Sequence, residues 1–224
     1  MPSPTDSNAD DPRAMRMIDA AYELLDEDGL EGLTIRAVLA RTGFARRAFY
    51  DNFTSKDDLV LAVFARTIRL AAGYYQSRGA DFSQPIDRLH LIVTSIGLGG
   101  AGQDQQWHIL KGDGITAWDR LHTGTKRGAA LSREHLRLAD SRPSELQAAL
   151  TPLLALIASH LREGMASGQF RNGDADLIAS YIYNLVSTTV HSEYLAEEIS
   201  AANPDRRMIL TRELWEFCRR AIAV

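Results

Sequence analysis

Residues 34–56 read TIRAVLARTGFARRAFYDNFTSK, and the architecture of the chain follows from this segment. Thr34 is a suitable N-cap for a short helix whose apolar residues recur at helical spacing until Gly43. A second short helix is predicted from about 45 to 52. Two short helices joined by a tight turn form a helix-turn-helix, in which the turn glycine adopts a positive φ.

The charge of this segment suits a nucleic acid. Between Arg36 and Arg47 there are four arginines and no acidic residue. The second helix of such a unit can enter the major groove, where Arg46 and Arg47 would reach base edges. An arginine fork on guanine contributes roughly 1–3 kcal/mol of discrimination. On spacing alone, a surface helical hairpin with a solvated arginine face explains the pattern equally well.

Other polar residues in the segment suit phosphate groups, which set the register without reading sequence. These are Thr34, Tyr50, Asn52 and Lys56. The predicted DNA-binding residues together are Thr34, Arg36, Ala45, Arg46, Arg47, Ala48, Tyr50, Asn52 and Lys56.

The flanking segments are predicted helices. Asp11-Pro12 is a cap followed by proline at the first helical position, and Gly29 stands where a helix C-terminus is expected. Ser55 and Asp58 form a carboxylate version of the capping box and begin a long helix that ends near residue 78.

These features resemble the DNA-binding domain of the TetR family of bacterial transcriptional regulators. The resemblance covers about residues 13–64, and residues 168–174 resemble the turn before the family's first dimerisation helix. The matching motifs are Glu27-Asp28-Gly29, Gly32-Leu33-Thr34-Ile35-Arg36, Gly43, Phe49-Tyr50-Asp51-Asn52-Phe53 and Ser55-Lys56-Asp57-Asp58-Leu59. The resemblance implies a three-helix DNA-binding domain, followed by a helical domain with a ligand cavity and a two-helix dimerisation surface.

The segment departs from the family pattern at three positions. Ala45 stands where the family usually has a small hydroxyl residue that caps the recognition helix, and alanine forfeits about 1 kcal/mol of capping. Arg47 replaces a common glycine and Asn52 a frequent histidine. These changes affect the expected base contacts more than the fold.

Composition agrees with an all-α chain and excludes several other classes. The 224 residues hold 30 alanines and 27 leucines against 7 valines and 14 isoleucines, which favours helices over strands. The single cysteine rules out an intrachain disulfide framework and a multi-cysteine zinc site. With no run of 18 apolar residues and a polar N-terminus, we expect no membrane span or signal peptide and a cytoplasmic setting.

The rest of the chain is predicted to be helical. The expected helices are 86–98, 104–111, 115–122, 129–139, 144–167, 174–198 and 205–222. The predicted organisation is a disordered tail (1–11), a helix-turn-helix domain (12–56), a linking helix (57–79) and a ligand-binding and dimerisation domain (80–224).

Two further patterns have weak functional interpretations. Residues 97–102 satisfy G-x-G-x-x-G, but the flanking sequence lacks the strand, helix and βαβ unit of a dinucleotide site, so a helix break is expected. The six histidines lack metal-ligand spacing, and Cys218 lies on an amphipathic helix. We therefore expect no metal, no cofactor and no catalytic residues.

By the resemblance, the second domain would bind a small molecule and pair with a second copy. Candidate pocket residues mix aromatic surface with polar groups: Trp107, His108, Trp118, His122, Tyr181, Tyr183 and Asn184. Candidate dimer residues are Tyr194, Leu195, Leu214, Trp215 and Cys218. The alternative is that both sets belong to an ordinary core.

The sequence thus predicts a dimeric, ligand-responsive transcriptional repressor that is released from a palindromic operator in double-stranded DNA by a small apolar or aromatic effector. Two alternatives stay open: an architectural DNA binder that needs no ligand, and an all-α enzyme that uses the C-terminal cavity. The net charge of −4 does not oppose DNA binding, because the basic segment is confined to a few turns of helix.

Overall fold

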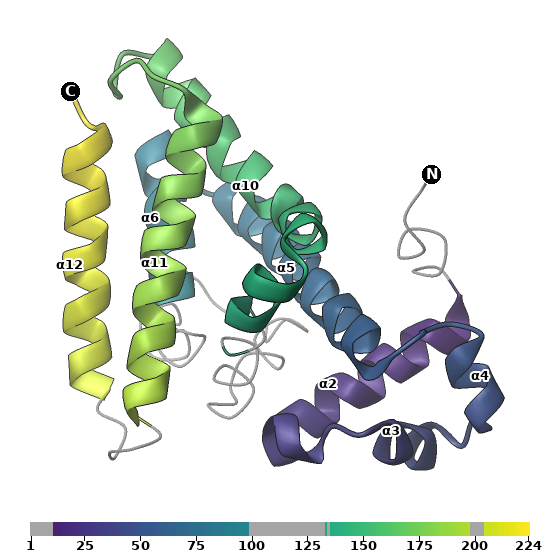
Figure 1. Ribbon diagram of the computed structural model, residues 1–224. Helices are drawn as coiled ribbons and strands as arrows, with labels where there is room; N and C mark the ends of the chain where they lie inside the picture. Colours follow the sequence, from purple (N-terminus) through teal and green to yellow (C-terminus); the bar gives the residue numbers. More distant parts are fainter. Residues whose placement is uncertain (1–10, 99–132, 134, 198–203) are drawn as a thin grey trace. The chain divides into compact units, whose positions relative to one another are not determined.

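The computed structural model describes residues 11–98, 133, 135–197 and 204–224 (Figure 1). The labelled helices in these ranges are α2 (Pro12–Gly32), α3 (Ile35–Thr42), α4 (Arg46–Tyr50), α5 (Lys56–Gly79), α6 (Pro85–Leu98), α10 (Pro143–Ala166), α11 (Ala175–Glu197) and α12 (Pro204–Ile222). The all-α prediction is confirmed. The helices expected at 104–111 and 115–122, and part of the one at 129–139, lie outside the described residues.

The chain forms two compact units whose boundaries differ from the predicted ones. The first contains the described residues up to Thr67 and those between 124 and 149, and the second contains the described residues of 68–98 and of 150–224. Both α5 and α10 therefore contribute to both units. The prediction starts the C-terminal domain at residue 80, whereas the described residues between 135 and 149 pack with the first unit; the His135 ring, for example, lies 5.7 Å from that of Phe64.

The first unit is built on a small apolar core. Met17 of α2, Val38 of α3 and Phe49 of α4 are fully buried, together with Leu59 at the beginning of α5. Burying side chains of this size stabilises the fold by about 1.5–3 kcal/mol each. The short helices α3 and α4 thus depend on tertiary packing, because isolated helices of eight and five residues are not stable in water.

The turn between α3 and α4 forms as the sequence predicts. Thr34 caps α3 by accepting a hydrogen bond from the Ala37 N–H at 3.1 Å. Gly43 ends the helix in the left-handed conformation (φ 71°), and its N–H donates to the Leu39 carbonyl at 2.9 Å. A side chain would be strained at this φ, so glycine is the favoured residue at the bend.

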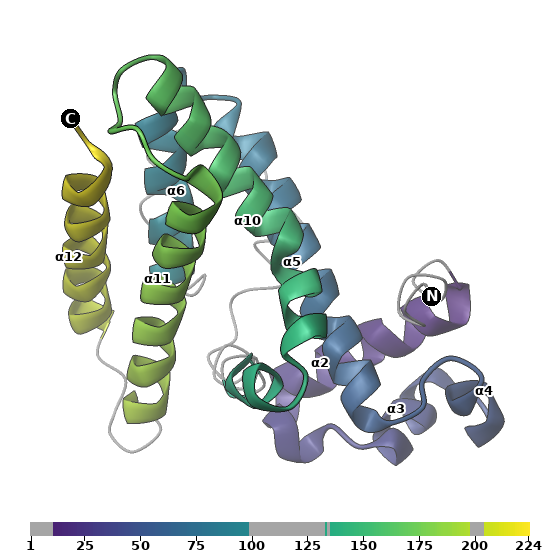
Figure 2. The same cartoon turned by 45° about the horizontal axis from the view of Figure 1, so that its top comes forward.

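In the second unit, α6 packs against both α11 and α12 (Figures 1 and 2). Gly97 of α6 and Thr211 of α12 lie at a close approach, where a Cβ atom on residue 97 would stand 2.7 Å from the Thr211 side chain. Close helix packing therefore accounts for the first glycine of the G-x-G-x-x-G pattern. Gly97 lies within α6, which agrees with the helix predicted at 86–98, so the helix break expected over 97–102 does not begin at this residue. Residues 99–102 lie outside the described part of the chain.

The turn that precedes α11 is tied to the end of the chain. The Arg171 N–H donates to the Ile222 carbonyl at 2.9 Å, and Phe170 forms a bridge pair with Ala223. Asp174 caps α11, because its carboxylate accepts from the Asp176 and Leu177 N–H groups at 3.0 and 3.1 Å. The beginning of α11 and the end of α12 are consequently held together.

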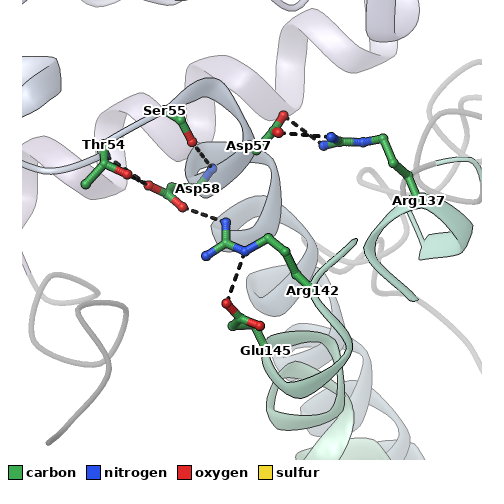
Figure 3. Close-up of polar contacts among 7 residues, drawn as sticks. All are labelled: Thr54, Ser55, Asp57, Asp58, Arg137, Arg142 and Glu145. Atoms are coloured by element: carbon green, nitrogen blue, oxygen red, sulfur yellow. Dashed lines mark hydrogen bonds and ion pairs between the residues drawn. The ribbon is translucent and has the colours of Figure 1, made fainter. Parts of the chain in front are cut away.

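An ionic latch joins the segment before α10 to the beginning of α5, within the first unit (Figure 3). We define the latch as the pairs Arg137–Asp57 and Arg142–Asp58. Both Nη atoms of Arg137 donate to the Asp57 carboxylate, at 2.8 and 2.9 Å. Arg142 donates to Asp58 at 2.5 Å and to Glu145 at 3.2 Å. Hydrogen bonds between charged groups of this kind are about twice as strong as neutral ones.

Asp58 has a second role at the N-terminus of α5. Its N–H donates to Ser55 Oγ at 3.1 Å, as the predicted capping box requires. Its carboxylate accepts from the Thr54 N–H at 3.0 Å and from the Thr54 hydroxyl, one residue earlier than expected. A single carboxylate thus caps α5 and anchors the arginine that precedes α10.

These contacts shift both carboxyl pKa values in one direction. The Arg137 hydrogen bonds lower the pKa of Asp57 below its ordinary value, against the opposing effect of burial. Burial raises the pKa of Asp58, but the hydrogen bonds from Thr54 and Arg142 together outweigh it, so this pKa is also lowered. Because both folded-state pKa values lie below the unfolded ones, the pairs stabilise the fold above the unfolded pKa and lose that contribution as the pH falls.

We expect Arg142→Ala to lower the free energy of unfolding by about 1 kcal/mol at neutral pH, since it leaves a partly buried carboxylate without its cation. Asp58→Asn should lose stability at neutral pH and show a shallower further loss below about pH 4. Urea unfolding at a series of pH values measures both effects.

The matched control is Arg69→Ala, because Arg69 is an exposed arginine of α5 that forms no ion pair with another described residue. Its stability should stay within about 0.5 kcal/mol of the parent chain. Equal losses for Arg69→Ala and Arg142→Ala, or an acid profile of Asp58→Asn parallel to that of the parent, would show that the latch does not stabilise the fold.

Candidate nucleic-acid interface

Both arginines predicted to read bases lie at the start of α4. Arg46 is the first residue of the helix and Arg47 the second, and both side chains are exposed. Arg46 donates from Nη2 to the Tyr50 hydroxyl at 3.2 Å, and its guanidinium carbon lies 5.6 Å from the centre of the Tyr50 ring. Arg47 forms no side-chain hydrogen bond or ion pair with any other described residue. Arg46 is therefore restrained by Tyr50, whereas no described side chain restrains Arg47.

The beginning of α4 lacks a side-chain cap, as the alanine at position 45 implies. Ala45 occupies the N-cap position with an extended backbone and makes no side-chain hydrogen bond. Ala48 is half-buried on the same helix. Without a hydroxyl at residue 45, the first turn of α4 depends on packing beneath it and on contacts between its own side chains.

Two predicted phosphate ligands are already engaged within the chain. Thr34 uses its hydroxyl oxygen as the cap of α3 and keeps its hydroxyl proton for another acceptor. The Asn52 amide donates to the Ala48 carbonyl at 2.9 Å, so its side chain folds back along the helix. This contact uses one of the two N–H groups of the Asn52 amide, and the phosphate contact of Asn52 stays a prediction. Tyr50 has 47% of its surface exposed, and Lys56 is half-buried at the start of α5.

One of the four arginines between Arg36 and Arg47 is paired with acidic side chains. Arg41 donates to both carboxylate oxygens of Glu27, at 3.0 and 2.6 Å, and lies 3.5 Å from Glu23. These contacts lower the pKa of Glu27 and raise the pKa of Arg41, with the side-chain hydrogen bond as the main cause. Arg36 is exposed and forms no ion pair with another described residue. The free charge is therefore concentrated on Arg36, Arg46 and Arg47.

Arg16 supports the turn between α3 and α4, and the sequence did not predict this role. Its guanidinium carbon lies 4.8 Å from the centre of the Phe44 ring, and Nη2 is 3.4 Å from the Thr42 carbonyl oxygen. Both partners flank Gly43, so α2 is attached to the turn that sets the direction of α4. No local motif predicts such a contact, because 26 residues separate Arg16 from Thr42.

The candidate pocket residues are only partly brought together. Tyr183 is buried, and its burial raises the pKa of the phenol; buried Tyr75 of α5 lies near it. Tyr181 is 62% exposed and Asn184 is also exposed, so neither lines the interior of this unit. Residues three apart share one face of a helix, so Tyr181 and Asn184 lie on the exposed side of α11 while Tyr183 lies on the buried side. Trp107, His108, Trp118 and His122 lie outside the described residues.

The candidate dimer residues are mostly inside their own unit. Leu214, Trp215 and Cys218 are buried, Trp215 stacks on His90 at 4.7 Å, and burial raises the pKa of the Cys218 thiol to about 11. The side chains of Tyr194 and Leu195 are outside the described set. These three side chains face α6 or the interior of their own unit, and their place in a dimer interface stays a prediction. The large apolar side chains that α11 and α12 expose are instead Leu177, Tyr181, Met208, Ile209 and Phe217.

Two negative observations concern the described residues alone. No group of three or more His, Cys, Asp or Glu side chains lies close enough there to hold a metal ion. Within the same ranges, no helix combines the length and the apolar character that crossing a membrane requires.

Comparison with known sequences agrees with this geometry. Residues 17–63 match the family model described as bacterial regulatory proteins of the tetR family. A 92-residue match, 33% identical, relates the chain to the HTH-type transcriptional repressor KstR of Rhodococcus jostii (strain RHA1). That match covers 40% of this chain and 42% of the relative, so the chain is aligned over less than half of that protein's length.

Solved structures extend the likeness to the whole fold. The fatty acid degradation regulator FadR from Bacillus halodurans superposes with a TM-score of 0.63 at 17% identity, covering 92% of this chain and 94% of that one. FadR from Bacillus subtilis, solved in complex with stearoyl-CoA, gives a TM-score of 0.61 at 17% identity over 93% and 98% of the two chains. The helix-turn-helix segment thus matches the tetR family model, and the solved structures share the fold of most of the chain.

Proposed function

We propose that the protein is a ligand-responsive transcriptional repressor that binds a palindromic operator as a homodimer. The observation that carries the proposal is the pair of exposed arginines on the first turn of α4, directly after a turn with left-handed Gly43. In a helix-turn-helix, the N-terminal residues of the second helix contact base edges. The relationship to the repressor KstR supports repression in particular.

Dimerisation is supported by the apolar side chains that α11 and α12 expose. Phe217 is 66% exposed and Tyr181 62% exposed, which is unusual for large aromatic side chains on helices. The ends of α11 and α12 are joined by the hydrogen bond from Arg171 to Ile222, so Leu177 and Phe217 are close to the same end of the pair. A two-fold dimer that covers these helices would present two copies of α4 to two half-sites.

The effector is proposed to be a small molecule that is mainly apolar or aromatic and binds in the second unit. Two buried tyrosines, Tyr75 and Tyr183, supply aromatic surface with polar groups, which is a common lining for small-molecule sites. A fold neighbour was solved with stearoyl-CoA, so long acyl chains are a reasonable first class to test. Only a ligand that binds one conformation better than the other can shift the protein away from its operator.

The alternatives make different demands. An architectural DNA binder would bind with strong salt dependence, little sequence preference and no small-molecule response. An all-α enzyme would turn over its bound ligand. A repressor would bind its operator selectively, and a ligand that the protein does not chemically change would abolish that binding. This result would favour the repressor over the architectural DNA binder and over the enzyme.

We expect Lys56→Ala to weaken binding to all DNA sequences by a similar factor and to reduce the salt slope of binding by about 1, because phosphate contacts release counterions. Fluorescence-anisotropy titrations at several salt concentrations measure the slope. The matched control is Arg212→Ala on α12, which removes the same charge far along the chain and should leave the slope unchanged. Equal slopes for Lys56→Ala and the parent would contradict the phosphate contact.

We expect Phe217→Arg to convert the dimer into a monomer, since the charge would be buried without a partner at the interface. Light scattering coupled to gel filtration measures the mass. The control is Leu70→Arg, which places the same charge on an exposed apolar position of α5. A dimeric Phe217→Arg variant, or a monomeric parent, would be evidence against the proposed interface.

We expect stearoyl-CoA to release the protein from DNA selected by the parent chain, whereas coenzyme A alone should not, if the effector is of the acyl type. An aromatic compound panel is run in the same assay. Release by members of the panel and not by stearoyl-CoA would assign an aromatic effector, and insensitivity to every compound would favour the ligand-independent alternative.

A further inference from the structure

We infer that Tyr50 is a positioning residue for Arg46, and that its hydroxyl directs the Arg46 guanidinium toward one guanine-containing base pair. The inference rests on the proposed function, because it concerns how the DNA-binding unit reads sequence. It assigns Tyr50 a role in sequence discrimination in addition to the phosphate contact expected from its polarity.

The geometry joins the two ends of α4. Arg46 is the first residue of this five-residue helix and Tyr50 the last. Residues four apart lie on the same face of a helix, which brings the guanidinium beside the phenol. The Nη2-to-hydroxyl distance of 3.2 Å is at the long end of the normal range, and the 5.6 Å between the guanidinium carbon and the ring centre is within reach of a cation–π contact.

Tyr50 is itself held by the core. Its ring meets the ring of Phe49 edge-on, with centroids 5.4 Å apart and planes at 83°. Phe49 is fully buried and also lies 5.6 Å from Phe53. A chain of contacts therefore runs from the apolar core through Tyr50 to an exposed arginine.

The contact between Arg46 and Tyr50 matters because the N-terminus of α4 has no side-chain cap. Ala45 provides no side-chain cap, so nothing polar at the N-cap fixes the first turn. The Arg46–Tyr50 contact restrains the same turn by joining its first residue to the last residue of α4. A long arginine side chain that is already ordered loses less conformational entropy when it binds a base.

The contact leaves both side chains able to bind DNA. Arginine has five N–H donors, and Tyr50 accepts one of them, so a complete fork edge remains for guanine O6 and N7. The Tyr50 hydroxyl accepts from Arg46 and keeps its own proton, which it can donate to a phosphate oxygen. Tyr50 would thus link a phosphate that sets the register to the arginine that reads the base.

Arg47 is the internal comparison. It lies next to Arg46 on the same helix, is exposed, and has no side-chain partner among the described residues. Whatever base or phosphate Arg47 contacts, that contact should not depend on the Tyr50 hydroxyl.

The experiment starts from a pool of random-sequence DNA duplexes, from which the full-length parent chain selects its preferred site. Each base pair of that site is then changed in turn, and the Kd is measured for the parent, Arg46→Ala, Tyr50→Phe and the double variant. Tyr50→Phe removes only the hydroxyl from an exposed ring, and circular dichroism verifies its helix content. Arg46→Lys keeps the charge but loses the fork.

We expect Arg46→Ala and Arg46→Lys to lose about 5- to 100-fold of discrimination at one G·C pair. Tyr50→Phe should lose about two- to tenfold at that same pair, corresponding to the ordering of one arginine side chain. The double variant should lose no more discrimination there than Arg46→Ala, and the position read by Arg47, located with Arg47→Ala, should be unaffected by Tyr50→Phe.

The outcomes separate this inference from the proposed function. If Arg46→Ala changes discrimination at one pair but Tyr50→Phe weakens all sequences equally or has no effect, the positioning role is overturned while the proposed function stands. If the parent shows no sequence preference, or Arg46→Ala loses none, the assignment of Arg46 as a base reader fails and the positioning role fails with it.

Discussion

The direction of α4 depends on the turn at Gly43. A positive φ at this residue ends α3, and the hydrogen bond from its N–H to Leu39 completes the last turn of that helix. Arg16 attaches α2 to both sides of the turn through Thr42 and Phe44. Because α4 is too short to be stable alone, its orientation is set by this turn and by buried Phe49 beneath it.

The ionic latch lies in the first unit, outside the helix-turn-helix. Asp58 both caps α5 and binds Arg142. The beginning of α5 and the segment that precedes α10 therefore share one carboxylate. Asp57 adds a bidentate pair with Arg137. Pairs of this kind contribute modestly to stability one at a time, but here they fix the beginning of α5 from a segment about eighty residues away in the chain.

On the helix-turn-helix, fewer arginines are without a partner than their number implies. Of the four arginines from Arg36 to Arg47, Arg41 is neutralised by Glu27, and Arg46 is oriented by Tyr50. The acidic partner belongs to α2, fourteen residues earlier, and only the packing of α2 on α3 brings it close. A focused positive surface on an otherwise acidic protein favours binding that depends on specific contacts over general attraction to DNA.

Local patterns were sufficient for the helix-turn-helix, the Thr34 and Ser55 caps and the turn before α11, because caps, turn glycines and helical periodicity act within a few residues. They also predicted the all-α class, through the excess of alanine and leucine. They could not separate core from surface on α11 and α12: both helices are apolar over wide faces, and the packing of α6 buries Leu214 and Trp215 while Tyr181 and Phe217 stay exposed. The same holds for Arg16, Arg41 and the latch, since the partner of each charged side chain is chosen by which helices pack together and not by spacing along the chain.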